Sequence, residues 1–157
     1  MSEVSGGTSV HYGGFWRRFL AYLIDDFIVG IMIAIVFCIF VSFMGMSVGD
    51  FKNVKASELS VVQIQILSLC GTLEFMLTWL YFALQESGTY SATLGKRLLG
   101  MRVTDESGKA ISFARASGRY FAKILSTILI IGWIMAAFTR RKQALHDMLA
   151  GTVIVVK

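Results

Sequence analysis

The chain has 157 residues, of which 55% are hydrophobic and 16% are charged, and its formal net charge is +5. Soluble domains contain about 45–50% apolar residues, so this composition excludes an ordinary soluble globular protein and predicts an integral membrane protein. In such a protein the positive excess sets the topology and attracts anionic headgroups, so it does not indicate nucleic-acid binding.

The N-terminal segment predicts a short leader followed by a membrane helix. Residues 1–12 are polar and are expected to be flexible, and they contain no cleavable signal. Residues 15–44 predict the first helix, because the uncharged run 27–44 is long enough to cross a hydrocarbon core of ~30 Å. Phe15 and Trp16 suit the interface, and the two arginines after them place the N-terminus in the cytoplasm.

Ionisable residues line one face of this first helix. Arg18, Tyr22 and Asp25 share that face at i, i+4 and i+7 spacing, and Asp26 adds a second acid. An α-helix rises 1.5 Å per residue, so Arg18 and Asp25 are about 10 Å apart and each needs a partner elsewhere. Charged groups at this depth normally face protein or water, so we expect another segment to cover them.

The second predicted membrane helix covers residues 60–85 and contains an acid near its middle, Glu74. Two interpretations are open for this side chain. It is either a buried, protonated or hydrogen-bonded acid that stabilises helix association, or a binding site for a proton or a cation.

The basic segment 86–123 is assigned to the cytoplasm by the positive-inside rule. Residues 96–115 within it predict a β-hairpin, with strands at 101–104 and 109–112 joined by a four-residue loop. The run TVIVV at 152–156 predicts a third strand beside that hairpin.

Residues 119–139 form a third apolar segment that is short for a full span and is flanked on both sides by basic residues. We expect a re-entrant or interfacial helical hairpin, bent near Gly132, that returns to the cytoplasm; a third full crossing is the alternative. Residues 142–157 predict a short amphipathic helix ended by Gly151, followed by the third strand.

Three separated motifs, GFWRRFLAYLIDD, TLGKRLLGMRVTDESGKAISFARA and QALHDMLAGTVIVV, occur in this order. With them the chain resembles the RDD family of small membrane proteins from residue 14 to residue 156. The family is named for one arginine and two aspartates, which fall on Arg18, Asp25 and Asp147; Asp26 stands where the family is usually apolar. The resemblance implies a poorly characterised family for which transport has been proposed, with some members linked to sodium/proton exchange.

These acids and bases predict a specific packing. We expect the helix that carries His146 and Asp147 to dock on the cytoplasmic end of the first helix and to pair Asp147 with Arg18. Asp25 is expected to meet a basic or hydroxyl group from the turn at Lys96 or from the second helix. Such a network either locks the C-terminal segment in place or takes part in transport.

The predicted fold is an all-α membrane protein with one domain, residues 1–157. It is a small transmembrane helical bundle of two full spans plus a third re-entrant or spanning segment, with a small cytoplasmic three-stranded sheet. The candidate ion- or proton-binding residues, or members of a structural charge network, are Arg18, Asp25, Asp26, Glu74, His146 and Asp147.

The predicted function is transport or ion translocation, proton- or sodium-coupled, by a homo-oligomer in a bacterial plasma or inner membrane. The alternative is a non-transporting scaffold or accessory subunit whose basic cytoplasmic face binds a partner or anionic lipid headgroups. No cofactor or metal is expected, and no Ser/His/Asp or Cys/His arrangement predicts an enzyme.

Overall fold

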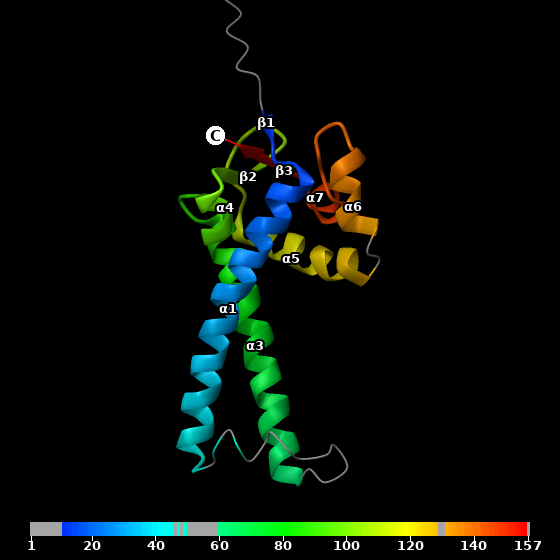
Figure 1. Ribbon diagram of the computed structural model, residues 1–157. Coiled ribbons are helices and arrows are strands. Elements are labelled where there is room, and N and C mark those ends of the chain that lie inside the picture. The colour runs from blue at the N-terminus through cyan, green and yellow to red at the C-terminus, as the bar shows by residue number, and fades with distance from the viewer. Residues whose placement is uncertain (1–10, 46, 48, 50–59, 129–130, 157) are drawn as a thin grey trace, which may run out of the picture.

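The computed structural model describes residues 11–156 with gaps at 46, 48, 50–59 and 129–130, and the side chains of 62, 128 and 131–134 lie outside the description. Two long helices dominate it: α1, Phe15–Phe43, and α3, Val61–Ser87. Both are long and apolar enough to cross a membrane. In Figure 1 they run side by side near the sheet and diverge toward their far ends. The two predicted membrane helices are therefore present.

Most of the α1 surface is apolar and open. Phe27 is 70% exposed and Phe43 is 82% exposed, whereas the buried residues of α1 include Arg18 and Asp25. This inversion of the soluble pattern, with apolar side chains outside and charges inside, suits a helix surrounded by lipid.

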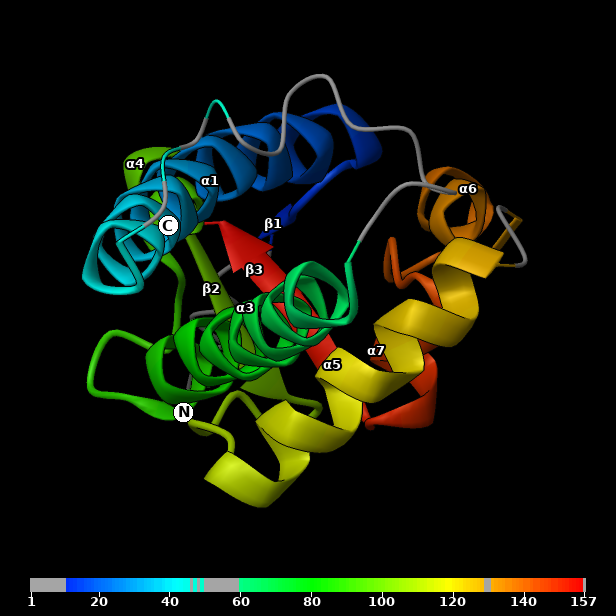
Figure 2. The same cartoon turned by 90° about the horizontal axis from the view of Figure 1, so that it is seen from below.

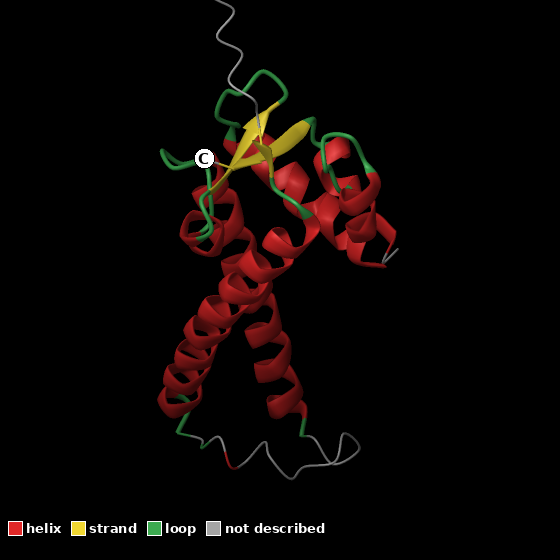
Figure 3. Ribbon diagram, turned by 45° about the horizontal axis from the view of Figure 1, so that its top comes forward, coloured by secondary structure: helices red, strands yellow, loops and turns green. Residues whose placement is uncertain are grey.

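A three-stranded antiparallel sheet lies at one end of the molecule, shown in yellow in Figure 3. Its order is β1 (His11–Tyr12), β3 (Thr152–Val156), β2 (Met101–Asp105). Val103 pairs with Ile154, and His11 pairs with Val156. The C-terminal run is thus the central strand, and the prediction of a three-stranded sheet is correct.

The predicted hairpin, by contrast, is wrong in its second strand. After β2 only one isolated bridge forms, between Thr104 and Ala110, and helix α5 begins at Phe113. Ser112 accepts a hydrogen bond from the Arg115 amide, so its hydroxyl caps the new helix and ends the extended chain. The missing strand is replaced by β1, which comes from the leader expected to be flexible; residues 1–10 lie outside the described part of the chain.

The third apolar segment forms two helices, α5 (Phe113–Ile128) and α6 (Ile131–Phe138), instead of one. Gly132 lies within α6, so the bend predicted at this residue is wrong; residues 129–130, between the two helices, lie outside the described part of the chain. Figures 1 and 2 show α5 crossing the end of α3 at a steep angle. Among the described residues only α1 and α3 qualify by length and apolarity as spans.

Two short helices complete the fold. Helix α4, Leu94–Leu98, begins after Thr93, and helix α7, Leu145–Leu149, is the predicted C-terminal helix and is followed by Gly151 at φ +60°.

The buried apolar core lies under the sheet. We call the sheet, α4, α5, α6 and α7, together with the adjoining ends of α1 and α3, the head. The core consists of Ala21, Ala83, Met101, Val103, Ile111, Ala116 and Ile154.

Candidate functional site

Asp25 is buried on α1, with 1% of its surface exposed, and it accepts hydrogen bonds from three other segments. The Tyr81 hydroxyl of α3 donates at 2.8 Å, and the Thr93 hydroxyl donates at 2.5 Å. The backbone amide of Gly95 in α4 donates at 2.8 Å. The expected hydroxyl partner from the second helix is present, and the turn before Lys96 contributes a hydroxyl and an amide instead of its basic side chain.

Arg18 and Asp147 meet where α7 docks on α1. The Arg18 Nη1 donates to Asp147 Oδ2, and its Nε donates to the Gly13 carbonyl at 2.7 Å. Asp147 also makes a local hydrogen bond, because its Oδ2 accepts from the Ala144 amide at 3.1 Å at the start of α7. The structure therefore brings the predicted pair together and fixes the helix that carries it.

Arg119, from the middle of α5, bridges two carboxylates. Its Nη1 donates to the two oxygens of Glu86 at 2.7 and 2.6 Å, and its Nε and Nη2 donate to Asp147 Oδ1 at 2.9 and 2.5 Å. The Lys96 ammonium pairs with Glu86 Oε1, which also accepts from Arg119. We call the resulting alternation of cations and anions the charge series; it joins α1, α7, α5, α3 and α4, and its members in order are Arg18, Asp147, Arg119, Glu86 and Lys96.

The members of this series outside the long helices have shifted pKa values. Burial opposes the ionisation of Asp147, but Arg119 and Arg18 beside it hold its pKa well below the usual range. Burial also opposes the charge of Arg119, yet Glu86 and Asp147 raise its pKa. Burial lowers the pKa of Lys96 even though Glu86 acts in the opposite direction. The ion pairs of Arg119 are therefore stable in the ionised form near neutral pH.

His146 lies beside this series and is uncharged near neutral pH. It is 4% exposed, its Nδ1 is 3.3 Å from the Ser126 hydroxyl, and its Nε2 is 3.5 Å from Asp147 Oδ1. Burial lowers its pKa to about 3, and the neighbouring Asp147 offsets only part of that shift. A neutral imidazole that contacts Ser126 is a packing and hydrogen-bonding group, so His146 does not exchange protons near pH 7.

The remaining two predicted residues lie outside the charge series. Asp26 is exposed and lines a pocket of about 140 Å³ together with Thr78 and Lys123. Glu74 lines a different and larger space of about 380 Å³, the groove between α1 and α3. Of the six candidates, Arg18, Asp25, His146 and Asp147 therefore gather around the charge series, whereas Asp26 lies in a neighbouring pocket bordered by α5 and Glu74 lies in the groove.

Sequence reasoning did not assign Glu86, Arg119 and Lys123 to the site, and it expected the turn at Lys96 to contact Asp25, not Glu86. Arg119 and Lys123 were assigned only as charges that set topology, although they are four residues apart and therefore share one face of a helix. Thr93 was also missed, and its position as N-cap of a short helix explains why its hydroxyl is close to Asp25. Within the described ranges, no group of three or more His, Cys, Asp or Glu side chains could hold a metal ion.

The fold and the site define a small helical membrane protein whose head is closed by buried ion pairs. The chain matches the RDD family over residues 12–151 and belongs to that family. The arginine and the two aspartates at positions 18, 25 and 147 bind the end of α1 to α3, α4 and α7.

The chain is similar to three proteins whose names assign no activity. An "Uncharacterized protein YxaI" of Bacillus subtilis (strain 168) is 37% identical over 147 residues, covering 92% of this chain and 97% of that protein. An "Uncharacterized membrane protein YteJ" of the same organism is 26% identical, covering 92% of this chain and 80% of that protein. An "Uncharacterized protein" of Haemophilus influenzae is 26% identical, covering 89% and 75%. No solved structure matches the chain.

Proposed function

We propose that this membrane protein translocates ions as a homo-oligomer and that Glu74 is the carboxylate that binds the transported proton or cation. The observation that supports this proposal is the position of Glu74 in the groove between α1 and α3. It lies midway between Val61 and Ser87, the ends of an apolar helix, and apart from the ion pairs of the head. An ionisable side chain at that depth is costly in lipid and is normally retained for function.

The lining of the groove suits a site that a second copy completes. Glu74 is its charged member, and Gly30 of α1 and Gly71 of α3 both border it, with no atom within 4 Å of where their Cβ would be. Small residues at such a surface allow another membrane helix to approach closely. Two spans cannot enclose a pathway by themselves, so a helix from a neighbouring copy would close the groove over Glu74.

In this proposal the head holds the two helices in place and does not carry the ion. Asp25 already accepts three hydrogen bonds, so it has little capacity left for a transported cation. Arg18, Arg119 and Lys96 occupy the oxygens of Asp147 and Glu86 in the same way. The carboxylate of Glu74 has a groove of about 380 Å³ beside it, more than the pocket of about 140 Å³ that Asp26 lines.

The experiment is a flux assay on the full chain in proteoliposomes that contain a pH-sensitive dye. An imposed sodium or pH gradient should drive proton movement through the wild type, and Glu74→Gln should insert normally but abolish that movement. The matched control is Glu106→Gln, which removes an exposed carboxylate whose ion pair with Arg141, at 3.5 Å, lies on the surface. Flux through Glu74→Gln equal to that of the wild type would overturn the proposal.

A second candidate function is the binding of anionic lipid or of a partner by a non-transporting scaffold. It is favoured by a surface pocket of about 530 Å³ on the head, which Arg17 and Lys142 line beside the 77% exposed Trp16. A cation next to an interfacial tryptophan suits an anionic headgroup. Retention of anionic over zwitterionic lipid during purification, reduced in Arg17→Gln and Lys142→Gln, supports this function, and equal retention in the variants contradicts it.

A further inference from the structure

A second pocket continues the groove of Glu74 toward the head. On α1 this pocket is bordered by Asp26, four residues before Gly30 in the groove. On α3 it is bordered by Thr78, four residues after Glu74. Residues four apart lie on the same face of a helix and are separated by about 6 Å along its axis. The two spaces therefore follow one another along the same pair of helices, and we call the one nearer the head the Asp26 pocket.

The linings of the two spaces differ in polarity. Among the described residues that line the groove, only Glu74 and Cys70 have side chains with hydrogen-bonding atoms. The Asp26 pocket has a volume of about 140 Å³, which is room for several water molecules among polar partners. Asp26 and Thr127 are exposed, so the pocket has an open side. Its side chains with a hydroxyl or a charge are Tyr22, Asp26, Thr78, Tyr120, Lys123 and Thr127.

Tyr120 of α5 lies between the two acids. Its ring centroid is 6.1 Å from that of Phe75, the residue that follows Glu74 on α3. Burial raises the pKa of Tyr120, and its interactions with Tyr22 and Glu74 raise that pKa further, so both groups lie close to it. Tyr22 in turn forms a hydrogen bond with Asp26. A phenol hydroxyl both accepts and donates hydrogen bonds, so Tyr120 can connect the groove to the pocket.

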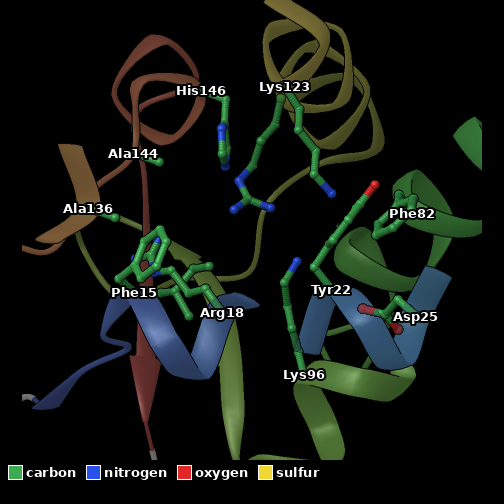
Figure 4. Close-up of a pocket in the computed structure, with 12 residues that line it drawn as sticks. Phe15, Arg18, Tyr22, Asp25, Phe82, Lys96, Lys123, Ala136, Ala144 and His146 are labelled. Carbon is green, nitrogen blue, oxygen red and sulfur yellow. The ribbon is translucent and has the colours of Figure 1, made fainter. Parts of the chain in front are cut away.

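The Asp26 pocket is separate from the charge series. Tyr22, Phe82 and Lys123 line both the pocket and the small cavity beside the series, so they form the wall between the two spaces. Figure 4 shows Tyr22 of α1 extending between Lys123 and Phe82. The Lys123 Nζ lies 4.6 Å from the ring centroid of Tyr22 and 4.1 Å from that of Phe82. Asp26 is the acid among the described residues that line the pocket.

We propose that the Asp26 pocket is a hydrated site that exchanges protons with Glu74 and that Asp26 is its proton-binding group. This inference rests on the proposed function of Glu74 and identifies the proton as the species that Glu74 carries. The proton leaves the Glu74 carboxyl group, passes along the Tyr120 hydroxyl and the water of the pocket, and binds the Asp26 carboxylate. Glu74 is then a carboxylate and Asp26 a carboxylic acid, which releases the proton to water at the open side.

The lining of the groove favours a proton over a sodium ion. A hard cation in a protein is held by several oxygen ligands, whereas a proton needs one carboxylate. Glu74 supplies the carboxylate, and the backbone carbonyls of α1 and α3 are used within the helices. Protonation also leaves Glu74 uncharged, and this is the form with the lower cost in an apolar groove.

The test uses proteoliposomes that contain the full-length chain and a pH-sensitive dye, in potassium salts without sodium, with valinomycin to carry the compensating charge. A pH gradient should drive proton movement through the wild type. Asp26→Asn should slow it by roughly tenfold or more, and Asp26→Glu, which restores a carboxylate, should recover most of the rate. Tyr120→Phe keeps the ring contacts with Phe75 and Phe82 and should slow the flux severalfold.

The matched controls are Glu106→Gln, an exposed acid, and Tyr90→Phe, a tyrosine that is 54% exposed, and both should have the wild-type rate. Wild-type flux through Asp26→Asn overturns this inference. Equal loss in Asp26→Asn and Asp26→Glu also overturns it, because the pocket would then need the shape of aspartate and not its proton. Wild-type flux through Glu74→Gln instead removes the proposed function, so the two failures are distinguishable. Flux that requires sodium would show that the carried species is not the proton alone and contradicts the inference.

Discussion

Arg119 is the single residue on which most of the head depends. Its guanidinium holds Glu86 from the end of α3 and Asp147 from α7, and it is 5% exposed. Buried ion pairs are poor sources of net stability, but the loss of one partner leaves the other charges buried and unpaired. Removing Arg119 takes a shared cation away from two buried carboxylates at once and leaves Asp147 with Arg18 and Glu86 with Lys96.

Arg119→Met is therefore expected to destabilise the folded protein by roughly 3–5 kcal/mol. The comparison is Arg115→Met one turn earlier, where the pair with Asp105 spans 3.9 Å and the arginine side chain is 45% exposed, so no measurable change is expected. The denaturation midpoint in mixed detergent and the yield of monodisperse protein measure both variants. Equal midpoints for the two variants would contradict this assignment.

His146 gives the head a pH dependence with a defined sign. Its pKa is lowered by burial from 6.5 to about 3, so the unfolded chain takes up a proton at pH values where the folded chain does not. The contribution of His146 to the free energy of unfolding is therefore complete above pH 6.5 and is lost as the pH decreases from 6.5 toward 3.

His146→Gln should flatten this decline between pH 6.5 and 5, a window in which Asp147, with its lowered pKa, is still ionised. The measurement is the unfolding midpoint across that window for both proteins. The same slope in His146→Gln and in the wild type would show that another group titrates there.

At the scale of elements, α4 packs closely against α1 at Gly95. A Cβ at Gly95 would lie 2.2 Å from the Ala21 carbonyl oxygen and 3.0 Å from Asp25 Cγ. Both atoms are held by α1, so the short helix would have to move away and would take the Gly95 amide away from Asp25.

Gly95→Ala should cost at least ~1–3 kcal/mol, as overpacking of a close contact does. The control is Gly118→Ala in α5, where no atom lies within 4 Å of the added Cβ and the gain in helix propensity is up to ~1 kcal/mol. Unfolding midpoints should move in opposite directions for the two variants. A shift of the same sign in both would mean that α4 is free to adjust.

Sequence reasoning predicted the features that depend on local pattern. Helices α1 and α3 follow from the length of their apolar runs, and the pairing of Arg18 with Asp147 followed from charges that needed partners. Distance along the chain does not explain the failures, because Arg18 and Asp147 are 129 residues apart and were paired correctly. Glu86 and Arg119 are 33 residues apart, and Arg119 had been interpreted by its sign alone, whereas Glu86 had not been interpreted at all. The second hairpin strand was lost because a single serine, Ser112, can start a helix where alternation of residues still favours a strand.

The whole molecule consists of a head and two helices that diverge away from it (Figure 1), and the sheet limits how the chain can cross a membrane. Strand β1 precedes α1, β2 follows α3, and β3 follows α6, yet all three belong to one sheet. Strands of one sheet lie on one side of a bilayer. The chain must therefore cross an even number of times between β1 and β2, and again between β2 and β3. Two crossings by α1 and α3, and no net crossing by α5 and α6, satisfy both conditions.

This arrangement makes a topology prediction that single cysteines can test in a background with Cys38 and Cys70 replaced by alanine. Ser47→Cys follows the far end of α1, whereas Ser107→Cys and Arg141→Cys lie on the head, and all three positions are exposed. A membrane-impermeant maleimide added to intact cells should label Ser47→Cys at once and the other two only after permeabilisation. Arg141 is the discriminating position, because a third full crossing would place it with Ser47. Labelling of Arg141→Cys in intact cells while Ser107→Cys stays protected would require β3 to leave the sheet it shares with β2, and that combination would remove the two-span arrangement.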